Sequence, residues 1–131
     1  MPEARDIGGS VFKNGSATLL ARVIGWDGAV LAPGGVSSIV CTTALLDDQD
    51  PDVELPVAGH ENVPLAVEAV LSATLRLDAL WTRDAVGYNF KHVLPLTQPL
   101  FTLAGRNYRV CYRILPTDGP VILVRYRLHA V

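Results

Sequence analysis

The amino-acid sequence predicts an all-β fold, a single antiparallel β-sandwich. Three observations carry this prediction: short segments in which apolar and polar residues alternate, turn signals rich in Gly, Pro, Asn and Asp between them, and hardly any run with helical periodicity. Short strands separated by such turns are typical of two sheets packed face to face. The chain has 131 residues, of which 50% are hydrophobic and 18% are charged, so we expect one domain with a packed core.

Strand signals run along most of the chain. The segment SATLLARVI alternates with a period of two, VSSIVCTTALL is a β-branched run, and Pro64 in NVPLAVEAV favours an edge strand. Near the end of the sequence, Asp118 and Gly119 in PTDGP supply the positive φ of a hairpin turn. Six or seven strands are expected, within residues 16–24, 36–46, 62–70, 88–95, 100–105, 107–116 and 120–131.

Two segments are expected to differ from this pattern. Residues 1–15 are rich in Gly, Ser and Asn and predict a flexible N-terminal arm, which leaves residues 16–131 as the sandwich domain. Residues 72–82 contain helix formers and residues able to cap a turn. At most a short helical turn is expected there, before Trp81.

The last two expected strands predict one apolar face and one basic face. Alternate residues of a strand point to the same side of its sheet. Aromatic and aliphatic residues occupy one set of positions in both strands, and the opposite set forms a basic stripe, which Lys91 joins if residues 88–95 pair with these strands. The expected core residues are Tyr108, Val110, Tyr112, Ile114, Ile122, Val124, Tyr126, Leu128 and Ala130, and the stripe residues are Arg109, Arg113, Arg125 and Arg127.

The arginine stripe has two interpretations. Its side chains bind carboxylates or phosphates of a partner, or they are solvent-facing residues that discourage edge-to-edge pairing of strands. A nucleic-acid surface would need aromatic residues between the charges, but the tyrosines alternate onto the opposite face. Because the chain has a formal net charge of −2, we expect a protein partner and no nucleic acid.

The stretch LLDDQDPDVE, residues 45–54, is the second charged feature. We expect an inter-strand loop that could dock on a partner, with Asp47 and Asp48 as candidate interface residues. An alternative is a calcium site made by Asp48, Asp50 and Asp52, which have the spacing that opens an EF-hand loop. The glycine and the bidentate Glu of such a loop are missing, so we expect no metal.

No catalytic motif is evident in the sequence. The residues His60, His92 and His129 lack the spacing of a zinc site, and neither a nucleophile elbow nor a phosphate-binding loop is present. We therefore expect neither enzymatic activity nor a cofactor. The alternative, a small enzyme, would need His92, Asp84 or Cys111 to converge in a pocket.

The sequence also bears on location. The first residues carry acidic groups where a signal peptide would carry basic ones, and no apolar run reaches the roughly 18 residues of a transmembrane helix. We expect cytoplasmic synthesis, no membrane association, and free thiols at Cys41 and Cys111.

The motifs near the C-terminus resemble those of a known family. In GRNYRVCY, Tyr108 matches the tyrosine corner of immunoglobulin-like sandwiches, with Val110 at the position of the inter-sheet cysteine of antibody domains. Followed by DGPVILVRYRL, this pattern resembles the immunoglobulin-like N-terminal module of phage upper-baseplate and tail proteins, over about residues 15–131. The resemblance implies a non-enzymatic virion or tail subunit. Such a subunit assembles in the host cytoplasm and binds itself or other virion structural proteins.

The alternative function is a ligand- or carbohydrate-binding β-sandwich module, which could depend on calcium. Such a module would use an exposed Trp26 or Trp81, or the acidic loop, for binding. Trp81 also has a structural interpretation, as an anchor that holds a loop on the core.

Overall fold

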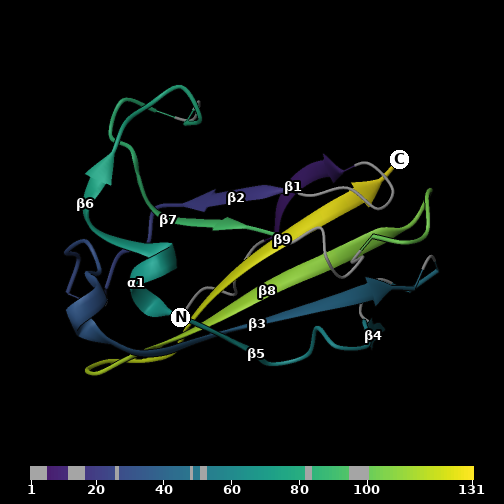
Figure 1. Ribbon diagram of the computed structural model, residues 1–131, viewed down its shortest axis with the longest axis horizontal. Coiled ribbons are helices and arrows are strands. Elements are labelled where there is room, and N and C mark those ends of the chain that lie inside the picture. The colour runs from purple at the N-terminus through teal and green to yellow at the C-terminus, as the bar shows by residue number, and fades with distance from the viewer. Residues whose placement is uncertain are drawn as a thin grey trace.

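The computed structural model describes residues 6–11, 17–25, 27–47, 49–50, 53–81, 84–94 and 101–131, and for residues 6–11 the backbone alone. The described chain forms two β-sheets that pack against each other, which confirms the all-β prediction (Figure 1). The six-stranded sheet has the order β1-β9-β8-β3-β4, with β5 also paired to β3, and the three-stranded sheet has the order β2-β7-β6. The elements are β1 (Asp6–Val11), β2 (Thr18–Ala21), β3 (Val36–Leu46), β4 (Glu54–Pro56), β5 (Val63–Leu65), α1 (Val67–Val70), β6 (Leu71–Arg76), β7 (Tyr88–Val93), β8 (Asn107–Pro116) and β9 (Ile122–Ala130).

Strands β3 and β8 lie at the centre of the six-stranded sheet and have the bounds that the sequence predicts. They pair antiparallel along most of their length, from Ser38 opposite Leu115 to Leu45 opposite Tyr108. Strands β2, β5, β7 and β9 also fall inside predicted segments. Alternation and β-branched content therefore locate these strands, because both properties follow from one face of a sheet being buried.

The first described strand differs from the prediction of a flexible arm over residues 1–15. Residues 6–11 form β1, which pairs parallel to β9 from Asp6 opposite Arg125 to Val11 opposite Ala130. A Gly- and Ser-rich segment can join a sheet because the pairing uses backbone N–H and C=O groups, which β9 would otherwise leave open at its edge. The rest of the expected arm lies outside the described residues.

The helix also differs in position from the prediction. The described helix is a single turn at Val67–Val70, and residues 71–76 continue as strand β6. Within 77–81, the N–H of Trp81 bonds to the carbonyl of Asp78 at 3.1 Å, which closes a tight turn. The helix formers in this region thus occupy an edge strand, since Leu71 is needed in the core, where it is 2% exposed. Among the described residues, no helix is long and apolar enough to cross a membrane.

Two further elements differ from the sequence prediction. Residues 101–105 are expected to form a strand but form a turn that ends at Gly105, where φ is +82°. Phe101 opens this turn and is fully buried against Tyr108, with the ring centroids 5.2 Å apart. Conversely, residues 54–56, at the end of the acidic stretch, pair with β3 as the short strand β4.

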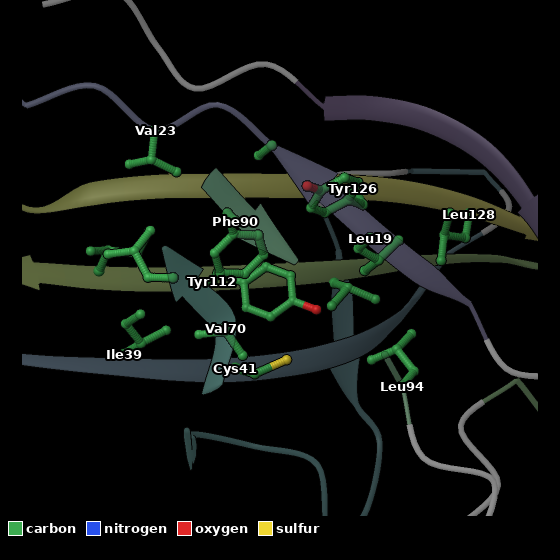
Figure 2. Packing of buried hydrophobic residues seen from close by; sticks show 14 of the residues in the cluster. Leu19, Val23, Ile39, Cys41, Val70, Phe90, Leu94, Tyr112, Tyr126 and Leu128 are labelled. Carbon is green, nitrogen blue, oxygen red and sulfur yellow. The ribbon is translucent and has the colours of Figure 1, made fainter. Parts of the chain in front are cut away.

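The core lies between the two sheets and is rich in aromatic residues (Figure 2). The inner side chains of β8 and β9 are those predicted, and Tyr112 is completely buried. Its ring stands edge-on to Phe90 from the other sheet, with centroids 4.7 Å apart, and to Tyr126, with centroids 6.0 Å apart. The hydroxyl of Tyr126 also donates to the carbonyl of Leu20 in β2 at 2.6 Å, so β9 is tied to the opposite sheet.

Asn89 is two residues before Lys91 in β7, so alternation predicts that it faces outwards with Lys91, yet it is only 1% exposed. The segment that follows β2 covers it. Its side-chain oxygen accepts the N–H of Val23 at 2.6 Å, and its amide donates to the carbonyls of Val23 and Leu31 at 3.1 and 2.9 Å. A buried amide is tolerated only when it is bonded in this way, so Asn89 fixes this segment on the three-stranded sheet.

Candidate functional site

The outer surface of β8 and β9 carries the predicted arginines on one face. We call this the arginine face, and it presents two rows of outward side chains. Arg109 lies directly opposite Arg127, Cys111 opposite Arg125, and Arg113 opposite Leu123. The face consists of Arg109, Cys111, Arg113 and Leu115 from β8 and Leu123, Arg125, Arg127 and His129 from β9.

Lys91 does not belong to the arginine face. It lies in β7, which pairs with β2 and β6 in the three-stranded sheet rather than with β8. Its expected place in the stripe depended on that pairing, which is wrong.

The acidic stretch meets the arginine face within the same chain. The carboxylate of Glu54 in β4 pairs with Arg109, whose side chain is 12% exposed. Like charges directly opposite each other destabilise a pair of strands, so this carboxylate offsets the approach of Arg109 to Arg127. No described carboxylate forms an ion pair with Arg127, directly opposite Arg109, or with Arg113, which lies towards the other end of the face.

Within the acidic stretch, Asp47 is a turn residue. Its carboxylate accepts the backbone N–H groups of Gln49 and Asp50 at 2.9 and 3.0 Å, and these bonds hold the pKa of that carboxyl below its ordinary value. Asp48, the second predicted interface residue, lies outside the described residues, as does Asp52 of the calcium candidate. No group of three or more His, Cys, Asp or Glu in the described part of the chain could hold a metal ion.

Two leucines make the far end of the arginine face apolar. Leu115 and Leu123 flank the β8–β9 hairpin and are 42% and 45% exposed. This end of the sheet lies opposite the end that carries β4, because Pro116 pairs with the first residue of β3 and Glu54 with the last. The face thus runs from an acidic stretch at one end to a basic and apolar surface at the other.

The two residues that the sequence marks as structural both hold loops. The buried hydroxyl of Tyr108 accepts the N–H of Leu103 at 3.0 Å, five residues upstream, as a tyrosine corner does. The indole of Trp81 donates to Asp84 at 2.8 Å and stacks at a tilt on Tyr88, with centroids 5.7 Å apart. Trp26 lies outside the described residues.

Asp84 is a hydrogen-bonding centre that the sequence reasoning considered only as a catalytic candidate. It accepts the indole of Trp81, the N–H groups of Val86 and Gly87, and a guanidinium N–H of Arg22 at 2.8 Å. These donors, led by the indole, hold the pKa of its carboxyl far below the ordinary value. An Asp three residues before a Gly, with its carboxylate bonded to the backbone N–H two residues on, is a common sequence signature of this arrangement.

The alternative catalytic residues do not converge. Cys111 faces outwards on the arginine face, Asp84 holds the loop after β6, and the ring of His92 lies against the core. Cys41 and Cys111 are both free thiols, as expected. They lie on neighbouring strands but on opposite faces of the sheet, because Cys41 pairs with Tyr112 and Cys111 with Thr42.

A pocket of about 100 Å³ lies between β3, β5 and β7, and sequence reasoning did not find it. Its polar groups come from distant segments and include His60, which precedes β5, and His92 in β7. No sequence spacing connects these residues, so no local signal marks the site. The wall consists of Cys41, Thr43, His60, Val63, Leu65, His92 and Leu94.

The titratable groups at this pocket are neutral at pH 7. Burial lowers the pKa of His60 and of His92 from the ordinary value of 6.5. Burial also raises the pKa of the Cys41 thiol to about 11 and that of Tyr112 well above the ordinary value. Cys41 is therefore a thiol and not a thiolate, so it is a poor nucleophile.

No protein-family model, curated protein or solved structure matches this chain. The arginine face and the pocket are therefore the two features on which a function can be argued.

Proposed function

We propose that the protein is a non-enzymatic assembly subunit that binds a second copy of itself through the arginine face. One observation carries this proposal: the face joins Arg113 and Arg127, which have no described ionic partner, to the exposed Leu115 and Leu123. A mixture of arginine and exposed aliphatic residues on one face is typical of protein contacts.

The chemistry of the partner follows from the charges at the two ends of the face. The acidic stretch presents exposed carboxylates at Asp47 and Asp50, beside the ion pair of Glu54 with Arg109. That internal pair is a local example of the contact we propose between copies, in which the acidic stretch of one chain meets Arg113 and Arg127 of the next. Contacts of this kind close into rings when the rotation between neighbours allows it.

We further propose a phage-type virion or tail as the setting of this assembly. This step rests on the resemblance of GRNYRVCY and DGPVILVRYRL to the module of upper-baseplate and tail proteins. The contact of Tyr108 with the backbone at Leu103 supports it, since a tyrosine corner is part of that resemblance.

The test is the solution mass from light scattering over a series of protein and salt concentrations. We expect a defined oligomer that dissociates as salt rises, because exposed charges steer the contact. The paired substitutions Arg113→Glu and Arg127→Glu should weaken association by about tenfold or more. Arg76→Glu, the same type of substitution at one exposed position of β6, is the control and should leave association unchanged.

Two outcomes would overturn the proposal. One is a monomer at every protein concentration at low salt. The other is an oligomer that the paired arginine substitutions do not weaken.

A further inference from the structure

We propose that the pocket between β3, β5 and β7 binds a small neutral organic molecule with an apolar body and one hydroxyl group, of the class of simple phenols. This site is separate from the arginine face, since it opens where the inner sides of the two sheets meet. The proposal is thus independent of self-association.

The size and lining of the pocket fit such a molecule. Its volume is about 100 Å³, and most of its wall is apolar, with Val63, Leu65 and Leu94 among the lining residues. An apolar cavity of roughly 150 Å³ in another protein holds benzene, so a single ring is the largest body to be expected in a site that opens to solvent. Figure 2 shows the thiol of Cys41 and the hydroxyl of Tyr112 pointing towards the side where Leu94 lies.

Two imidazoles in the pocket have hydrogen-bonding capacity that the described protein does not use. His60 is only 9% exposed, yet no described residue forms a hydrogen bond with its ring. His92 uses Nδ1 for the hydroxyl of Tyr112 at 2.6 Å, and within the described chain its Nε2 has no partner. Both side chains line a pocket that is open to solvent, so these ring nitrogens can bond to a molecule that enters it.

The hydrogen-bond chain behind His92 sets what the molecule must offer. The buried hydroxyl of Tyr112 contacts both the Cys41 thiol and His92 Nδ1. If the phenol donates its proton to Nδ1, then Nε2 carries the ring proton and is a donor. A neutral His60 keeps one acceptor nitrogen. A single hydroxyl can accept from His92 and donate to His60, whereas a purely apolar molecule leaves both unbonded.

Ionic ligands fit the pocket less well. Both imidazoles are neutral at pH 7, so they provide no charge to hold an anion. The pocket includes Cys41, His60 and His92, but among the described residues no group of three such side chains could hold a metal ion. These observations favour a neutral molecule that hydrogen-bonds.

The experiment uses phenol as the probe, with toluene and benzoate as controls of similar size. Titration is followed by the ring C–H resonances of the three histidines, with the exposed His129 as internal reference. We expect saturable shifts at His60 and His92 but not at His129, with a dissociation constant on the order of 1 mM for a ligand of this size. At ten times that concentration, Tm should rise by roughly 4 °C.

Substitutions separate pocket binding from other effects. Val63→Phe fills the pocket and should abolish both the shifts and the rise in Tm. Val93→Phe adds the same ring on the outer side of β7, where Val93 is 54% exposed, and should leave binding intact. His60→Phe gives a second, independent loss of binding that also removes the acceptor.

Three results would overturn the proposal. Phenol could give no saturable shift at His60 and His92, or shift His129 to the same extent. Toluene or benzoate could bind as tightly as phenol, which would remove the role of the hydroxyl. Binding that survives both Val63→Phe and His60→Phe would place the site elsewhere.

Discussion

Tyr112 and His92 join the two sheets through a hydrogen bond of 2.6 Å between the phenol oxygen and Nδ1. The rings stand nearly perpendicular, at 87°, with their centroids 5.4 Å apart. Tyr112 is wholly buried in β8, so the bond satisfies a hydroxyl that would otherwise cost free energy in the core. One tyrosine thus connects the aromatic core to the wall of the pocket.

The first prediction concerns the pH dependence of stability. The pKa values of His60 and His92 are lowered by burial, so the unfolded chain takes up protons more readily than the folded chain below pH 6.5. The free energy of unfolding should therefore fall as pH drops below 6.5, by at most about 1.4 kcal/mol per pH unit and per histidine. This decrease in the free energy of unfolding ends once the pH is below the pKa values that the two histidines have in the folded chain.

Urea unfolding at several pH values between 7.5 and 4.5 measures this loss. The paired substitutions His60→Gln and His92→Gln should flatten the slope, while His129→Gln at an exposed position should not. The carboxyls of Asp47, Asp78 and Asp84 affect the stability in a separate, lower pH range. Their lowered pKa values stabilise the fold above their ordinary pKa near 3.8 and cease to do so as pH falls below it. A slope between pH 6.5 and 4.5 that survives the paired histidine substitutions would contradict this assignment.

The second prediction is that Asn89→Ala strongly destabilises the fold. The substitution leaves the N–H of Val23 and the carbonyls of Val23 and Leu31 without their side-chain partner in a buried place. Unsatisfied buried groups cost about 1–3 kcal/mol each, so a loss of roughly 3 kcal/mol or more is expected in urea unfolding. Asn107→Ala, which removes an exposed contact with His129, is the control and should cost less than about 1 kcal/mol. Equal losses from the two substitutions would mean that the bonds of Asn89 add no stability of their own.

The same region shows what the sequence does and does not reveal. The inner and outer rows of β8 and β9 follow from alternation, because each strand is buried on one side only. The position of β7 in the other sheet does not follow, since pairing is decided by contacts between distant segments. Asn89 is on an outward row but is covered by a segment about 60 residues earlier in the chain.

Of the two candidate sites, the arginine face can be predicted from the sequence and the pocket cannot. The arginines of the arginine face are four residues apart in β8 and two apart in β9, so their shared side can be predicted from the sequence. The pocket brings together Cys41, His60 and His92, whose spacing has no local meaning. The strand β1 was missed for another reason: its pairing uses the backbone and needs no apolar side-chain pattern.

The third prediction concerns Gly87, which precedes β7. Its φ is +107°, and a Cβ at this position would lie 2.3 Å from the carbonyl oxygen of Arg76. Gly87→Ala therefore combines backbone strain with a clash against backbone that cannot move freely, and should destabilise by roughly 2–4 kcal/mol.

Substitutions at two other glycines distinguish the cost of the backbone strain from the cost of the clash. Thermal or urea unfolding measures the stability of each variant. Gly105 has a φ of +82° and open space around it, so Gly105→Ala should cost only about 1 kcal/mol. Gly34 has neither feature, so Gly34→Ala should be nearly neutral. A Gly87→Ala protein as stable as the Gly105→Ala protein would show that the clash is relieved by a small movement of β6.

The fourth prediction is that Asp84 holds the loop between β6 and β7 in place without stabilising the rest of the sandwich. Removing its carboxylate by Asp84→Ala releases the indole of Trp81, the guanidinium of Arg22 and the N–H groups that follow it. We expect the amides of Val86 and Gly87 to exchange hydrogen about tenfold faster or more, because their protecting acceptor is gone.

Hydrogen exchange at single residues can test whether this effect is local. Amides of β8 should keep their protection, since none of the groups that bond to Asp84 belongs to β8. Asp27→Ala is the matched control: its carboxylate also accepts a backbone N–H, that of Ala29 at 3.1 Å, in an exposed turn. That substitution should leave Val86 and Gly87 unchanged. If Asp84→Ala speeds exchange throughout β8 as well, the carboxylate supports the whole fold, and the exposed Leu77, Leu80 and Val86 form part of one cooperative unit with the core.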